Sequence, residues 1–344
     1  TKAAAMPDEN SSKLDQFRNG FSGDLRILTY GVLQQPANTT QNPGNNFIEI
    51  PHYITYLEAR PDLRFESSFL DLSVKPRAKL NYSIWEEGKR EGETDWADDW
   101  YINEWLARLK VADRLFLSYG RENIQWGPSY LFCPSNPFFT DNGRSNPYME
   151  VAGMDFARVV FVPHLFWTVS FIVNTGEGEN VIIGTEPYQK TYAAKIDYTG
   201  RQNYASVIVS QKDSRVTGGF FGGWTLTDAI LLYGEGKLTK GSMALYARED
   251  EATSTVTIDR FHKDDSNIKP VILAGGSYTF ENSGALTLEY MYNDQGYSRS
   301  EADTYYLLRK KGAAALESGR PDVWLGKAVL YQTGDSGLKF LRKN

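Results

Sequence analysis

The sequence predicts an all-β protein that folds as a single transmembrane antiparallel β-barrel of about 16–18 strands. Long segments alternate between apolar and polar residues, and the links between them are alternately short and long. A membrane-spanning helix needs about 20 consecutive apolar residues. The best apolar run, residues 156–171, is interrupted by Arg158, Pro163 and His164. We expect residues 1–23 to form a polar N-terminal tail and residues 24–344 to form the barrel.

Residues 70–85 show the clearest alternation. Apolar side chains such as Leu72 share one face of the predicted strand, and Lys75 and Lys79 share the other, at a strict period of two. Residues 57–65 behave in the same way, and both segments exceed the five or six residues usual for strands of soluble proteins. Alternation recurs, clearly or ambiguously, at residues 101–111, 192–198, 229–236, 286–292 and 324–333.

The predicted strands are joined by short links that alternate with long ones, which is typical of outer-membrane barrels. The short links lie at residues 66–69, 111–114, 162–165, 199–203, 225–228 and 280–284. The long links lie at residues 34–46, 86–99, 123–150, 176–187 and 295–322. We therefore expect short turns on one rim and long loops on the other, about 16 strands by Gly334, and a further strand that starts near Leu338.

Two features depart from this pattern. Pro61 and Pro76 lie inside predicted strands, and a closed barrel accommodates proline only at a bulge. The chain ends at Asn344, without the terminal aromatic residue typical of bacterial outer-membrane barrels, so we expect one or more C-terminal strands to be missing. At Thr1 there is no charged-then-apolar leader, so we expect a secretory signal peptide to have been removed.

Composition excludes several other classes. The formal net charge of −6 argues against a nucleic-acid-binding protein. The single cysteine, Cys133, excludes an intramolecular disulfide and a cysteine-rich metal site, and there is no haem-attachment motif. Three histidines lie in unrelated contexts, without a GxSxG or HExxH motif. We expect no enzymatic activity, no cofactor and no metal.

Residues 120–128 read GRENIQWGP, and residues 134–138 read PSNPF. This stretch resembles the GRQ-x-x-x-WG and NP pattern found in large bacterial outer-membrane barrels, among them porin-like proteins and the alginate-export and capsule-assembly types. The resemblance extends over residues 100–139. It implies a barrel of roughly 16–18 strands in the bacterial outer membrane, without identifying one subfamily.

If the apolar faces meet lipid, the opposite faces bring charged residues into the barrel interior. The expected channel-lining residues are Glu58, Arg60, Asp62, Arg64, Asp71, Lys75, Arg77, Lys79, Glu104, Arg108 and Lys110. A basic excess in a confined aqueous path concentrates anions. The hypothesis is a path for polar or anionic solutes, with acidic saccharides as one class. The alternative is that these charges pair across strands and simply keep the interior hydrated.

The long link at residues 123–150 is rich in proline and aromatic residues, so we expect it to pack against another part of the molecule. It can fold into the barrel as a constriction, cap the barrel outside, or contact a partner. Its candidate residues are Trp126, Tyr130, Phe132, Phe138 and Phe139. Residues 217–224 read TGGFFGGW, a pattern that favours a strand bend covered by neighbouring rings.

Three further interpretations stay open. The barrel can be a sheath around a periplasmic or lumenal protein partner such as a multihaem cytochrome. It can be a plugged barrel that binds or assembles polysaccharide at the cell surface. The chain can also be a soluble all-β carbohydrate-active domain. Under the first two interpretations, as for the channel, outer-membrane lipid surrounds the wall.

Overall fold

The computed structural model describes residues 20–40, 42–139, 143–144, 148, 150–178, 190–212, 215–242, 245–250, 255–260, 266–319 and 322–337. Among these residues thirteen antiparallel strands form one sheet, in which each strand pairs with the next along the chain except at one place, where a separate hairpin comes between two neighbours. The sheet strands are β1 (Phe21–Leu33), β2 (Tyr53–Glu66), β3 (Leu70–Ile84), β4 (Thr94–Ala112), β5 (Leu115–Glu122), β6 (Met154–His164), β7 (Trp167–Gly176), β8 (Thr191–Thr199), β9 (Asn203–Lys212), β10 (Arg215–Thr227), β11 (Ile230–Lys240), β14 (Ile268–Thr279) and β15 (Ala285–Asn293).

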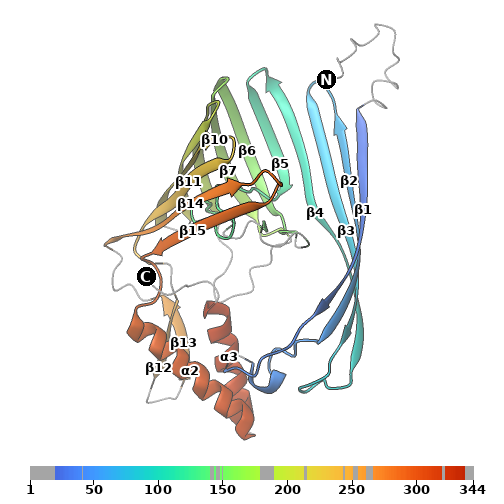
Figure 1. Cartoon of the computed structure of the whole chain (residues 1–344), viewed down its shortest axis with the longest axis vertical. Helices are drawn as coiled ribbons and strands as arrows, with labels where there is room; N and C mark the ends of the chain where they lie inside the picture. Colours follow the sequence, from blue (N-terminus) through green and yellow to red (C-terminus); the bar gives the residue numbers. More distant parts are fainter. Residues whose placement is uncertain are drawn as a thin grey trace.

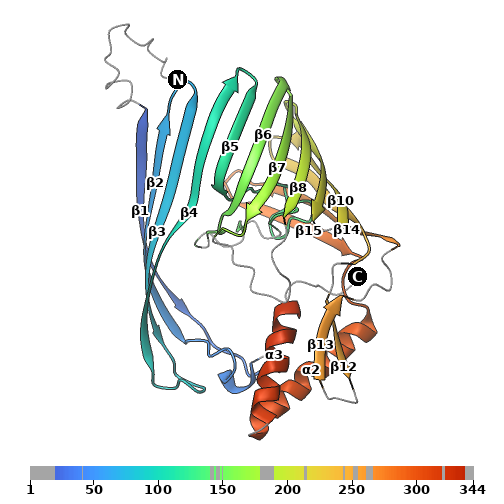
Figure 2. The same ribbon diagram turned by 180° about the vertical axis from the view of Figure 1, so that it is seen from behind.

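The sheet curls into a barrel-like wall, so that β14 and β15 lie across the interior from the middle strands (Figure 1 and Figure 2). Short turns of two to five residues join alternate pairs of strands, such as β2 to β3 and β14 to β15, at one rim. Most of the longer connections leave from the opposite rim. The predicted all-β antiparallel meander is therefore confirmed.

A separate hairpin lies between β11 and β14 in the sequence, formed by β12 (Leu245–Asp250) and β13 (Thr255–Arg260). A 3-10 turn, η1 (Pro43–Asn45), belongs to the connection between β1 and β2. Both lie beyond the loop rim of the wall, near the C-terminal helices (Figure 1).

The two internal prolines are accommodated as the sequence requires. The register of β3 against β4 shifts between Lys75 and Pro76, so that Lys75 is opposite Glu104 while Pro76 is opposite Ile102. Asn103 is the extra residue, which makes this a β-bulge. At Pro61 the pairing of β2 with β3 is interrupted between Ala59 and Leu63. At both prolines the regular strand pairing is interrupted, so the missing proline N–H leaves no ladder hydrogen bond unformed.

The C-terminal part differs from the prediction. Two helices, α2 (Arg299–Ser318) and α3 (Asp322–Gly337), occupy most of the segment expected to be a long loop followed by a strand at residues 324–333. Ser298 begins α2 with a capping box to Glu301, and Gly312 lets the helices approach closely, since an added Cβ would lie 3.0 Å from Val329. The strand expected near Leu338 and most of the expected tail lie outside the described residues.

Within the described part of the chain, no helix is long and apolar enough to cross a membrane.

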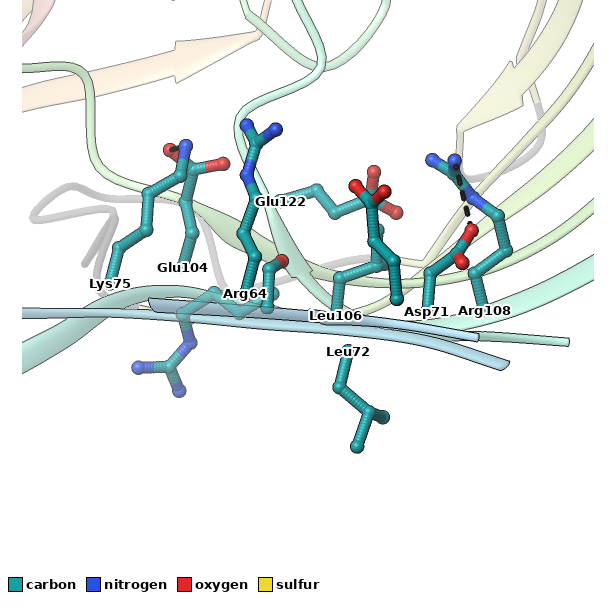
Figure 3. A pocket seen from close by; sticks show the side chains of 11 residues that line it. Arg64, Asp71, Leu72, Lys75, Glu104, Leu106, Arg108 and Glu122 are labelled. Carbon is teal, nitrogen blue, oxygen red and sulfur yellow. Dashed lines mark hydrogen bonds and ion pairs between the residues drawn. The ribbon is translucent and has the colours of Figure 1, made fainter. Parts of the chain in front are cut away.

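The pairing registers divide the sheet into two faces, because alternate residues of a strand point to opposite sides. We call the side of Lys75 the inner face and the side of Leu72 the outer face. Figure 3 shows Leu72 on the side of the sheet opposite Lys75, Glu104 and Arg108. The outer face exposes large apolar side chains along the whole sheet, including Leu57, Leu72, Leu80, Leu109, Leu117, Phe161, Phe171, Ile196, Val207, Val209, Phe220, Leu232, Leu238, Ile272 and Leu288.

Candidate functional site

The expected channel-lining residues all project from the inner face of β2, β3 and β4. The register places Glu58 opposite Lys79 and Asp71 opposite Arg108, and the remaining members follow at a period of two on either side of the bulge. The sequence therefore assigned these residues to one face correctly. That they line a channel stays a prediction.

Each of the four acidic residues in this set has a cationic partner. Glu58 pairs with Arg60 at 2.5 Å, and Glu104 pairs with Lys75 at 2.8 Å. The other two pairs are Asp62 with Arg77 at 2.9 Å and Asp71 with Arg108 at 3.9 Å. Pairing across strands, the alternative weighed from the sequence, thus accounts for much of the charge on this wall.

The register also adds acidic residues that the sequence analysis did not include. Asp24, Glu66, Asp95 and Asp99 face inward, because each is opposite an inner-face residue of the neighbouring strand. Alternation alone could not have found Asp99, because the bulge at Asn103 reverses which residues of β4 face inward. The inner wall of β1–β4 is therefore strongly charged but close to balanced, rather than basic as a whole.

We call residues 123–153 the inner loop, and its described residues include several that pack against the inner face. Trp126 and Phe139 are buried together with Phe156, Ile172 and Ile208, whose side chains belong to the inner faces of β6, β7 and β9. Of the other aromatic candidates, Phe138 packs edge-on against Trp126 and Phe156, Phe132 is half-buried, and Tyr130 is 47% exposed. These described residues of the loop therefore lie inside the wall, and that the loop forms a constriction stays a prediction.

One end of the inner loop is attached to β11 through Glu235. This carboxyl group is 0% exposed and accepts hydrogen bonds from the hydroxyls of Ser129, at 2.9 Å, and Ser135, at 3.2 Å. Gly127 passes so close that a Cβ would collide with the Glu235 carboxyl oxygen, and its φ of +82° also requires glycine. On β15, Glu289 accepts hydrogen bonds from the Tyr233 hydroxyl, at 2.7 Å, and from the Tyr130 backbone N–H, at 2.5 Å.

The other end of the inner loop is attached to β2 and β3. Two guanidinium nitrogens of Arg77 donate to the two carboxylate oxygens of Glu150, at 2.5 and 2.6 Å, and Arg60 donates to the Tyr148 carbonyl, at 2.7 Å. Burial opposes ionisation of Glu150, but the hydrogen bonds and charge of Arg77 outweigh it and lower the pKa of this carboxyl. The inner loop thus joins opposite parts of the wall.

The glycine-rich segment TGGFFGGW forms part of β10 and supports the same loop. The position of Gly219 leaves room for the inner-loop backbone, because an added Cβ would lie 2.9 Å from the Ser135 carbonyl oxygen. The ring of Tyr204 lies over Gly223, as expected for a glycine covered by a neighbouring ring. The register shift in this strand lies further on, between Thr225 and Thr227.

No protein-family model matches the chain. No curated protein matches it in sequence either.

The chain resembles solved bacterial outer-membrane porins in the arrangement of its strands. OmpF of Salmonella typhi, in a complex with daunomycin, is 11% identical with a TM-score of 0.44, and the match covers 81% of each chain. OprD of Pseudomonas aeruginosa is 9% identical with a TM-score of 0.39, over 75% of this chain and 63% of that chain. A mutant porin of Rhodopseudomonas blastica is 10% identical with a TM-score of 0.34, over 80% and 93%.

Proposed function

We propose that the chain is a channel of the bacterial outer membrane that passes small polar solutes along the inner face of its sheet. The observation that carries the proposal is the contrast between the two faces. The outer face exposes apolar side chains on strand after strand, from Leu57 on β2 to Leu288 on β15, and the inner face of β1–β4 is charged. Lipid on one side and water on the other satisfy both faces.

The apolar outer face also separates the channel from a soluble carbohydrate-active domain. Soluble monomers seldom expose a continuous apolar patch beyond a few hundred Å². Here Leu72, Leu117, Phe171 and Val207 come from strands spread around the wall, and all are exposed. A soluble protein with this surface would aggregate, so a lipid environment is the arrangement that these residues favour.

We extend the proposal to anionic solutes, acidic saccharides included, on the basis of individual cations rather than of net charge. Among the described residues, no ion pair joins Arg64 or Lys79 to a carboxylate. Lys79 instead lies over the ring of Tyr101, at 5.2 Å. These two inner-face cations keep their charge available to a passing anion.

The inner loop narrows the path in this proposal, because it occupies part of the space that the wall surrounds. A plugged barrel that binds polysaccharide is the second candidate. Its support is the attachment of the inner loop at both ends, to Glu235 on β11 and to Arg77 on β3. In the channel, solutes pass between the inner loop and the charged wall; in the plugged barrel the inner loop closes that path.

Solute entry into proteoliposomes tests the proposal and separates the two candidates. The full chain is reconstituted into vesicles, and swelling is followed in arabinose, glucose and larger sugars, with protein-free vesicles as the control. The channel predicts swelling that is fast for small sugars and slows with solute size. If wild-type protein passes none of them but Glu235→Ala passes small sugars, the inner loop is a plug. If neither passes any sugar, the channel proposal is wrong.

A further inference from the structure

A cavity of about 230 Å³ opens in the inner face between β2, β3, β4 and β5. Figure 3 shows Arg64, Lys75, Glu104 and Arg108 standing around it on one side of the sheet. Its volume lies below the roughly 300–1,000 Å³ of sites for drug-sized ligands, so it suits a solute the size of one sugar ring.

The cavity exists because a row of small or uncharged residues lies between two rows of long charged side chains. Ser73 on β3 and Leu106 on β4 lie side by side in the register and line the floor, and Gly120 on β5 is the neighbour of Leu106 in the next strand. An added Cβ on Gly120 would collide with the Trp105 carbonyl oxygen, so this position cannot carry a side chain without a backbone shift. Gly120 is also the first residue of the GRENIQWGP stretch, which gives that glycine a role in shaping the wall.

Two guanidinium groups at the cavity can receive an anion. Arg64 points into it, and no described residue forms an ion pair or a hydrogen bond with its guanidinium. Arg108 is held only loosely by Asp71, at 3.9 Å, and both side chains are about two-fifths exposed. Lys75, in contrast, forms an ion pair with Glu104, with 2.8 Å between Nζ and Oε1.

One buried acceptor at the same cavity has no donor. Oε2 of Glu122 receives a hydrogen bond from Arg158, at 2.9 Å, while Oε1 is buried without a hydrogen-bond partner among the described residues. A buried acceptor in this state costs free energy until a donor reaches it. Oε1 has almost no accessible surface, so a solute reaches it only if the Glu122 side chain shifts; the exposed carboxylate of Glu66, which also lines the cavity, is the acceptor open to a neutral hydroxyl.

We propose that this cavity is a binding subsite for a small hydroxylated carboxylate, such as a single uronate unit of an acidic saccharide. The carboxylate lies between Arg64 and Arg108, where guanidinium groups bind it with paired hydrogen bonds. A ring hydroxyl donates to the exposed carboxylate of Glu66, which also lines the cavity. The inference rests on the proposed function, since the solute reaches this cavity along the inner face.

Saturation-transfer NMR of the full chain in detergent micelles tests the subsite without requiring conductance. D-glucuronate is the probe, with D-glucose as the neutral analogue and D-glucosamine as the cationic one. Arg64→Gln should weaken glucuronate binding about tenfold or more, because a charge-assisted contact is lost. Leu106→Trp should abolish binding by filling the floor. The matched control, Arg26→Gln, removes a cation of β1 that faces inward opposite Arg60 and lies outside the cavity, and it should change affinity by about twofold or less.

The subsite would be overturned by equal transfer to glucuronate and glucose, by an unchanged affinity in Arg64→Gln, or by an equal loss in Arg26→Gln, which would indicate a diffuse field. Stronger transfer to glucosamine would also contradict it, since the ligand would then be a cation. Retained heat-modifiable gel migration shows that each variant is folded. Glucuronate binding without vesicle swelling would contradict the channel but not the subsite, and swelling without selective binding would do the reverse.

Discussion

Replacing Glu235 with alanine should expose the one thiol of the chain. Cys133 is 0% exposed and lies on the inner loop between Ser129 and Ser135, the two residues that bind Glu235. Each of these buried hydrogen bonds contributes about 1.5 kcal/mol, so their loss weakens the attachment by about 3 kcal/mol. This corresponds to about a 100-fold larger population in which this end of the loop is open. Alkylation of Cys133 should accelerate by a similar factor.

The assay is the rate of maleimide labelling of the full chain in detergent micelles, followed by mass spectrometry. Asp71→Ala is the matched control. It also removes an inner-face carboxylate, but Asp71 lies at the start of β3 and pairs with Arg108 on β4 rather than with the inner loop. Its labelling rate should stay near that of the wild type. Equal rates in wild type and Glu235→Ala, or the same acceleration in Asp71→Ala, would refute the role of Glu235 as an attachment point.

Three further predictions concern the other attachment and the two faces. Arg77→Met should lower the free energy of unfolding in micelles by about 3 kcal/mol, because it leaves the carboxylates of Asp62 and Glu150 without their buried partner, and Arg77→Lys should recover part of that loss. The folded state lowers the pKa of the Glu150 carboxyl below its ordinary value of 4.5, so ionisation of this group stabilises the fold. That stabilisation is present above about pH 4.5 and is lost as the pH falls through the lowered pKa of the folded state. Urea titrations from pH 7 to pH 3 should show this loss in the wild type and not in Glu150→Gln. Leu72→Arg should cost about 2–4 kcal/mol in lipid vesicles, whereas Ser73→Arg, on the inner face, should cost about 1 kcal/mol or less; equal costs would contradict the assignment of the faces.

The strands and their faces follow from sequence because a period of two is local information. Leu72 and Lys75 differ in parity, and parity alone decides which side of the strand each occupies. The same reasoning placed Arg64 and Arg108 together on the inner face. It was not applied beyond Asn103, where one extra residue reverses the parity of the rest of β4.

The first helix was missed because residues 295–322 were assigned to a long link, and the second because the weak alternation at residues 324–333 was interpreted as a strand. Ala302, Tyr305, Leu308 and Gly312 recur at three- and four-residue spacing, and all are buried on one side of α2. The capping box at Ser298 marks the start of the helix in the sequence itself. These signals were available and outweigh the weak alternation at residues 324–333.

The attachments of the inner loop could not be predicted from the sequence. Ser129 and Glu235 are 106 residues apart, and Arg77 and Glu150 are 73 apart. Neither pair belongs to a motif, and Glu235 lies in a segment whose alternation is ambiguous. Such contacts depend on where a long loop packs inside a curved sheet, which is a property of the whole fold.

Single-channel recording in planar lipid bilayers tests most directly whether water crosses the membrane along the charged inner face. Purified full-length protein should produce discrete current steps of uniform size in salt solution. The contradicting result is an absence of steps from protein that is inserted, as judged by protection of its strands from added protease. Lipid would then surround a closed wall, and the inner face would not be a path.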